Sequence, residues 1–205
     1  MNILETVRQT LVAFCVEFVH HPYLCYTEHG QHALFYAKLY SALPEELRYT
    51  TWQQQKVCIL QKEYPTAANL EKPQRQHWDV SVLSVPLISR ENSAESYDYF
   101  NLLAAIEFGM NEAKEHLVDD IKRLEHADSN SAQKFIVHFY RLSNAGNKIS
   151  GRDWSQNSAR IMKPVEVGDL TIDSSVEIFY CIADNTGKYE NGAWHIKSGK
   201  ISSLM

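Results

Sequence analysis

The sequence predicts an α/β fold in which a mixed central sheet is flanked by helices. Apolar residues follow helical and strand-like patterns in the order helix, strand, strand, strand, helix, strand between residues 28 and 142. The chain of 205 residues is 44% hydrophobic and 22% charged, a composition typical of globular proteins. No apolar run approaches the ~20 residues of a membrane-spanning helix. We therefore expect one domain over residues 1–205 and no membrane partner.

Two helices are expected at the N-terminus. Apolar side chains recur at helical spacing over residues 3–20, and Pro22 ends the pattern because proline disfavours helix immediately before it. A second helix is expected over residues 28–43. Thr27 is a good N-cap residue for it, and Pro44 marks its end.

Strands and one further helix complete the expected core. Continuous or alternating apolar runs predict strands at 57–64, 77–85 and 102–108. Helical spacing returns over residues 112–126, and an aromatic run predicts a buried strand at 135–142. We expect that helix to be a crossover, which would make the strands on either side of it parallel.

The composition changes after residue 142, where we expect a basic loop followed by a C-terminal strand extension over residues 143–205. Strands are predicted at 176–183 and 193–197. The window from Lys134 to Lys163 holds six basic residues and one acidic residue, although the net charge of the chain is −5. Such a window is either a solvated loop or a contact for a phosphate backbone. The residues that we assign to nucleic-acid binding are Lys148, Arg152, Arg160 and Lys163.

Two carboxylates lie within the predicted sheet. Asp79 falls inside the second strand, and Glu107 falls at the end of the third. A carboxylate in an apolar strand is costly unless it is paired or binds a metal. Hard oxygen ligands of this kind suit Mg²⁺ or Mn²⁺. Alternatively, Asp79 could end a strand ladder or cap a turn, and Glu107 could be a surface acid at a strand end.

This arrangement resembles the core of the PD-(D/E)XK nuclease superfamily, which has the restriction-endonuclease-like fold. The resemblance covers residues 28–142 and implies an α-β-β-β-α-β core, in which acids on two neighbouring strands hold a metal ion. Asp79 and Glu107 match these acids, and Glu28 matches a glutamate that many members add from the preceding helix. Glu28 could instead serve only the helix dipole. The implied activity is Mg²⁺- or Mn²⁺-dependent hydrolysis of phosphodiester bonds.

The position two residues after the second acid departs from the family's pattern. The family has a lysine there, and this chain has Gly109. Lys62 on the first strand is our first candidate for a migrated catalytic lysine, and Lys114 is the second. Strict alternation would place Gln61 and Glu63 on one sheet face and Lys62 on the other. The alternative is a catalytically inactive nuclease-fold protein that binds nucleic acid or another protein.

Nine histidines raise a second metal hypothesis. Glu28 and His32 share a helix face, and His77 and Asp79 share a strand face, so nitrogen and oxygen ligands could form a zinc site. No HExxH motif supports this hypothesis. His138 lies in an apolar strand, a position typical of a core histidine.

Cysteine usage and the resemblance together set the remaining expectations. The four cysteines form no CxxC pair, and the N-terminus lacks signal-peptide features, so we expect reduced thiols and a cytoplasmic location. The resemblance implies nucleic acid as the partner, with DNA as the first choice, although the residues do not distinguish DNA from RNA. A homodimer, or a partner subunit that supplies the missing lysine, stays open.

Overall fold

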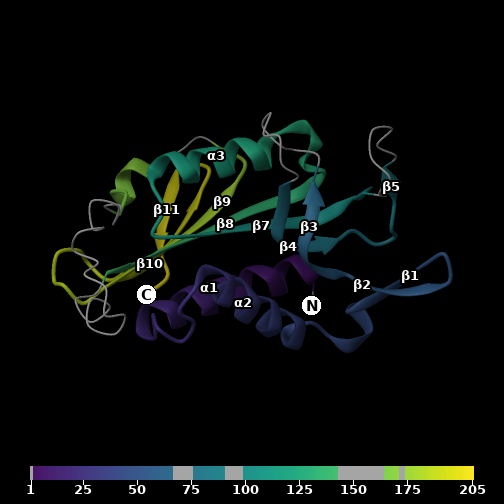
Figure 1. The fold of residues 1–205 in the computed structure, drawn as a ribbon, viewed down its shortest axis with the longest axis horizontal. Helices are drawn as coiled ribbons and strands as arrows, with labels where there is room; N and C mark the ends of the chain where they lie inside the picture. Colours follow the sequence, from purple (N-terminus) through teal and green to yellow (C-terminus); the bar gives the residue numbers. More distant parts are fainter. Residues whose placement is uncertain (1, 67–75, 91–98, 143–163, 171–173) are drawn as a thin grey trace.

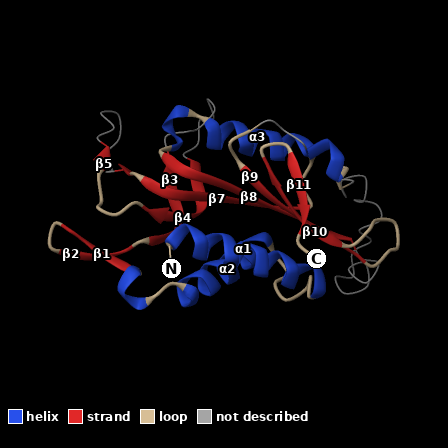
Figure 2. Cartoon of the chain, turned by 180° about the vertical axis from the view of Figure 1, so that it is seen from behind, coloured by secondary structure: helices blue, strands red, loops and turns tan. Residues whose placement is uncertain are grey.

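A computed structural model of the chain describes residues 2–66, 76–90, 99–142, 164–170 and 174–205. A seven-stranded mixed sheet lies between helices, which confirms the expected α/β class. Helices α1 (Ile3–His20) and α2 (Glu28–Ala42) cover one face, and α3 (Lys114–Glu125) covers the other, as Figure 1 and the reverse view in Figure 2 show. In sheet order, the strands are β11 (Lys200–Ser203), β10 (Gly192–Lys197), β9 (Glu177–Asp184), β8 (Ser131–Leu142), β7 (Leu102–Met110), β4 (Gln76–Leu83) and β3 (Leu60–Thr66).

Local signals set the ends of the two N-terminal helices. The Asn2 side chain accepts a hydrogen bond from the Leu4 amide at 3.1 Å, which caps α1. The Thr27 hydroxyl accepts one from the Gly30 amide at 3.0 Å and caps α2. The expected cap at Thr27 is therefore confirmed, and Glu28 begins the helix as expected.

The central strands have the expected directions. β3 and β4 are antiparallel, as are β4 and β7, whereas β7, β8 and β9 run parallel. Parallel neighbours need a crossover connection, and α3 supplies it between β7 and β8. The expected parallel pairing of the strands at 102–108 and 135–142 is confirmed.

The region before β4 differs from the expectation. Instead of one strand at 57–64, the structure has a separate hairpin, formed by β1 (Tyr49–Trp52) and β2 (Gln55–Cys58), and then β3 (Figure 1). β3 also continues through Pro65 to Thr66, beyond the expected end at residue 64. Because β3 is the last strand of the sheet, its proline need not interrupt a ladder on the outer side.

Short elements complete the described chain. A two-stranded sheet of β5 and β6 stands where only a loop was expected, and β11 adds an edge strand that was not predicted. Their bounds, and those of three 3₁₀ turns, are β5 (Ser89–Arg90), β6 (Tyr99–Phe100), η1 (Glu45–Leu47), η2 (Ala127–Ser129) and η4 (Val167–Leu170). Among the described residues, no helix has the length and apolarity needed to cross a bilayer. The cytoplasmic location stays a prediction.

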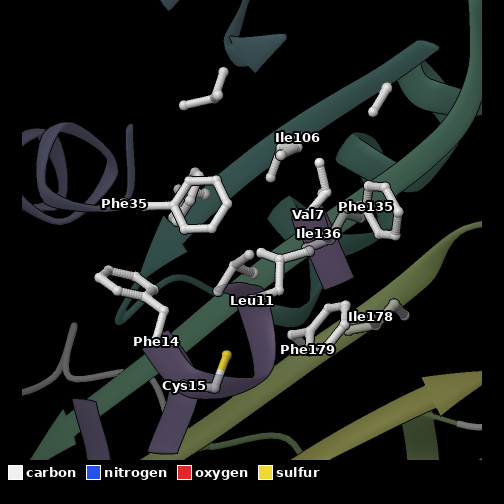
Figure 3. Packing of buried hydrophobic residues seen from close by; sticks show 14 of the residues in the cluster. Val7, Leu11, Phe14, Cys15, Phe35, Ile106, Phe135, Ile136, Ile178 and Phe179 are labelled. Carbon is white, nitrogen blue, oxygen red and sulfur yellow. The ribbon is translucent and has the colours of Figure 1, made fainter. Parts of the chain in front are cut away.

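The core between the sheet and the N-terminal helices fixes which way β7 faces. The Phe14 ring of α1 lies 5.5 Å from that of Phe35 and 6.3 Å from that of Phe108, centroid to centroid. Figure 3 shows Phe14 and Phe35 packed over the strands. Phe108 therefore faces α1 and α2, and alternation along β7 directs Glu107 towards α3.

Candidate functional site

Beyond the end of its pairing with β4, β7 donates amide hydrogen bonds to two carboxylates instead of to a strand. The pairing of β4 with β7 ends at Val80 and Ile106. Beyond that point, Asp79 Oδ2 accepts a hydrogen bond from the Phe108 amide at 2.8 Å, and Glu28 Oε2 accepts one from the Met110 amide, also at 2.8 Å. The structure thus brings together Glu28 and Asp79, two of the three acids singled out from the sequence.

These two acids are held where ionisation is unfavourable. Burial raises the pKa of Asp79 to about 6, against the opposing effect of the Phe108 amide. Burial, and then the negative charge of Asp79, raise the pKa of Glu28 to about 7. Each amide occupies one oxygen of its carboxylate, so the second oxygen is available to another ligand. Buried acids that repel one another in this way can be stabilised by a cation.

Glu107 lies on the strand next to Asp79, as expected, but its carboxylate meets a different helix. It is 4% exposed and forms an ion pair with Arg123 of α3. The Arg123 guanidinium also donates to Gln76 Oε1 at 2.7 Å. Burial and the charge of Asp79 raise the pKa of Glu107, and Arg123 opposes this rise. Glu107 already has a cationic partner in Arg123, whose charge also lowers the pKa of Asp79, but by less than burial raises it.

The lysine candidates occupy distinct places. Lys62 Nζ lies 3.2 Å from Glu63 Oε1, at the edge of the same cluster. Glu63 has a φ of 53°, in the left-handed region, so the strict alternation expected for β3 does not hold at this residue. Lys114 is exposed at the first position of α3. Of the two candidates, Lys62 is the one whose charge reaches the α2 side of the site.

Gly109 is sterically constrained. A Cβ atom at this position would lie 3.1 Å from Nδ1 of His138 and 3.2 Å from its Cε1. The buried imidazole therefore fills the space through which a longer side chain would extend. A lysine at the family's usual position would require His138 to move.

A histidine pair adjoins Asp79. Nε2 of the fully buried His32 lies 2.8 Å from Nδ1 of His29, and Nδ1 of His32 lies 3.9 Å from both Glu63 Oε1 and Asp79 Oδ1. Burial, and then the charge of Lys62, lower the pKa of His32 to about 4, so this imidazole is neutral at pH 7.

The sequence argument named His32 as a possible ligand but missed His29 and Glu63. Among the described residues, His29, His32 and Glu63 form the group whose possible ligand atoms lie within 4.8 Å of one another. The three-residue spacing of the histidines was a usable signal, because such residues are neighbours on a helix. Nothing in the pattern of β3 indicated the left-handed backbone at Glu63.

The four basic residues assigned to nucleic-acid binding, Lys148, Arg152, Arg160 and Lys163, lie outside the described residues. Their role stays a prediction from the sequence. Comparison with known proteins gives no further assignment: no protein-family model, no curated protein and no solved structure matches this chain.

Proposed function

We propose that this chain is a metal-dependent hydrolase of phosphodiester bonds in nucleic acid, with DNA as the first-choice substrate. The observation that carries the proposal is the buried pair of carboxylates, Asp79 and Glu28, anchored on successive outward-facing amides of β7. Amide hydrogen bonds fix the orientation of each carboxylate, as outer-shell groups do for metal ligands. With the two small sheets β1–β2 and β5–β6 set aside, the element order α2-β3-β4-β7-α3-β8 also follows the α-β-β-β-α-β order that the resemblance implies.

Each residue has a stated part in this proposal. Asp79 and Glu28 would hold Mg²⁺ or Mn²⁺ through the oxygens that the β7 amides leave free. A bound ion of this class polarises a phosphodiester and lowers the pKa of an attacking water. Lys62 would stabilise the charge that develops on the phosphate. Glu107 is the third acid of the set, and it would become a ligand only if its ion pair with Arg123 opened.

The second candidate function is a nuclease-fold module that binds nucleic acid or protein without cleaving it. Two observations favour it. The His138 ring blocks a side chain at Gly109, the family's lysine position. Arg123 already neutralises Glu107, so that acid needs no metal ion.

The deciding experiment must separate metal binding from the structural role of these acids. Asp79→Asn and Glu28→Gln keep an oxygen that can accept the β7 amide, but they remove the negative charge. The matched control is Asp119→Asn, because Asp119 is 51% exposed on the outside of α3. All variants would be tested with labelled single- and double-stranded DNA and RNA, with Mg²⁺, with Mn²⁺ and with a chelator.

We expect the wild-type chain to cleave at least one of these substrates, and only when the metal is present. This cleavage should be lost in Asp79→Asn and Glu28→Gln and unchanged in Asp119→Asn. Nucleic-acid binding without cleavage of any substrate would reject hydrolysis and favour the binding module. Cleavage that survives both charge-removing substitutions would show that these acids are not the site.

A further inference from the structure

We propose that His32, Glu63 and Asp79 form a binding site for one transition-metal ion of the class that accepts both imidazole and carboxylate ligands, with Zn²⁺ as the type case. The site would lie between the first turn of α2 and the facing part of β3 and β4. It shares Asp79 with the proposed hydrolytic site, but it goes beyond that function, because it would bind its ion whether or not phosphodiester bonds are cut.

The backbone brings these groups together from three elements. His29 and His32 are three residues apart, so they are neighbours on one face of α2. In β3, Glu63 stands between Lys62, which pairs with Val80, and Tyr64, which pairs with Trp78. Glu63 is therefore in register with Asp79 on the next strand, and both carboxylates reach the same imidazole of His32.

The hydrogen bond between the two histidines orients the metal-binding nitrogen. Nε2 of His32 and Nδ1 of His29 are 2.8 Å apart, so one of them donates to the other. If His32 donates from Nε2, its Nδ1 carries a lone pair directed at the two carboxylates. If His29 donates instead, His32 Nδ1 must carry a proton whose best acceptor in the described chain is the Asp79 backbone, a contact too weak to count as a well-formed hydrogen bond. The first arrangement avoids a buried donor without a well-formed hydrogen bond.

The two distances from His32 Nδ1 match ligands around an ion better than they match hydrogen bonds. His32 is 0% exposed, and its Nδ1 has no hydrogen-bond partner among the described residues. The nearest carboxylate oxygens, Glu63 Oε1 and Asp79 Oδ1, are each 3.9 Å from it. Two bonds of ~2.0–2.2 Å that meet at a metal ion hold their ligand atoms ~3–4 Å apart. An ion between these three atoms would satisfy the buried nitrogen.

The ligand chemistry selects the class of ion. An imidazole nitrogen suits Zn²⁺ and other transition metals, whereas Mg²⁺ and Ca²⁺ prefer ligand sets made of oxygen alone. One nitrogen and two carboxylate oxygens leave a further coordination position open, as in catalytic rather than structural zinc sites. Lys62, 3.2 Å from Glu63 Oε1, is the cation that balances Glu63 in the absence of an ion. His29 acts as the positioning residue, because it holds His32 through Nε2.

The test uses the purified full-length chain after treatment with a chelator. Calorimetric titration with ZnCl₂ and with MgCl₂ would measure affinity and stoichiometry, and CoCl₂ would report the ligand type through its visible spectrum. The informative variants are Glu63→Gln and His29→Ala, because these side chains are 46% and 81% exposed and their loss leaves the core intact. His126→Gln is the matched control, since His126 is an exposed histidine near a different carboxylate. Thermal unfolding would verify that each variant is folded.

We expect the wild-type chain to bind one Zn²⁺. The Zn²⁺ affinity should be at least ~100-fold lower in Glu63→Gln, ~10-fold lower in His29→Ala and unchanged in His126→Gln. Mg²⁺ at a hundredfold excess should not displace the Zn²⁺. Absence of Zn²⁺ binding, equal competition by Mg²⁺, unchanged affinity in Glu63→Gln, or a thiolate charge-transfer band with Co²⁺ would each overturn the inference. If the chain binds Zn²⁺ as expected but cleaves no substrate, the hydrolase proposal fails and the metal-site inference stands.

Discussion

Removal of the charge on Asp79 should stabilise this protein while it abolishes the proposed activity. Asp79 is 18% exposed at the side chain, and burial raises its pKa from 3.8 to about 6. At neutral pH the Asp79 carboxylate is therefore ionised in the folded chain, although its buried surroundings disfavour the charge. Asp79→Asn keeps an oxygen for the Phe108 amide, which lies 2.8 Å from the carboxylate, and it also relieves the repulsion of Glu28.

The size of the effect follows from linkage between ionisation and folding. A pKa raised from 3.8 to about 6 corresponds to ~3 kcal/mol of lost stability once the group is ionised in both states. Between these two pH values the folded chain binds more protons than the unfolded chain, so its stability falls as the pH rises through this window. The asparagine NH₂ group needs an acceptor of its own, which offsets part of the gain. We expect a net gain of ~1–2 kcal/mol, or ~3–6 °C in melting temperature for a chain of this size.

The assay is thermal unfolding of the wild-type chain, Asp79→Asn and the exposed control Asp119→Asn, in a chelator, at pH 5 and pH 7.5. The advantage of Asp79→Asn over wild type should be largest at pH 7.5 and close to zero at pH 5, because the linkage part of the gain falls by about half while the cost of the asparagine NH₂ group stays the same. Asp119→Asn should differ little from wild type at either pH. A variant destabilised by more than ~1 kcal/mol at pH 7.5 would refute the reasoning, because it would show that ionised Asp79 supports the fold.

Three further outcomes test other parts of the structure. Glu177→Gln should lower the unfolding free energy at pH 7 by ~2–3 kcal/mol, as measured by urea denaturation. Hydrogen bonds from His195, Arg8 and Lys197 outweigh burial and hold the pKa of Glu177 below its usual range. The difference between variant and wild type should shrink below pH ~4, because protonation of Glu177 removes the stabilisation from the wild-type chain. Gly109→Ala should cost ~1–3 kcal/mol, because its Cβ would lie 3.1 Å from His138 Nδ1, and an unchanged melting temperature would contradict the packing described at that strand. Lys62→Ala should lower the rate of phosphodiester cleavage by ~10²–10³-fold and leave metal binding intact, so a loss of calorimetric metal binding would contradict its role as a charge stabiliser.

Much of the element order could be predicted from sequence because the signals are local. Asn2 and Thr27 cap their helices through side chains that reach amides two and three residues away. The crossover through α3 followed from an apolar strand, a helical pattern and another apolar strand in succession. The β1–β2 hairpin was missed because its strands are short, polar and paired only with each other.

The site was only partly predictable, because it depends on contacts between residues that are far apart in the chain. Asp79 and Glu28 stood out because each has an unusual or favoured place in its own element. Their shared role along β7 depends on hydrogen bonds between residues 29 and 82 positions apart in the chain. The partner of Glu107 is an arginine on the next helix, and no spacing rule connects the two.

By itself, therefore, the sequence determined the α/β class, the helix ends, the strand directions around α3 and three of the acids that the fold partly or fully buries, Glu28, Asp79 and Glu107. Periodicity and capping act over a few residues, so they can be read from the chain. Only the tertiary structure decided which charges meet: Glu63 Oε1 and Asp79 Oδ1 each lie 3.9 Å from the same nitrogen of His32, and burial shifts the pKa of Asp79 and of His32 in opposite directions. Desolvation depends on everything that surrounds a group in the folded protein, so no local pattern can report it.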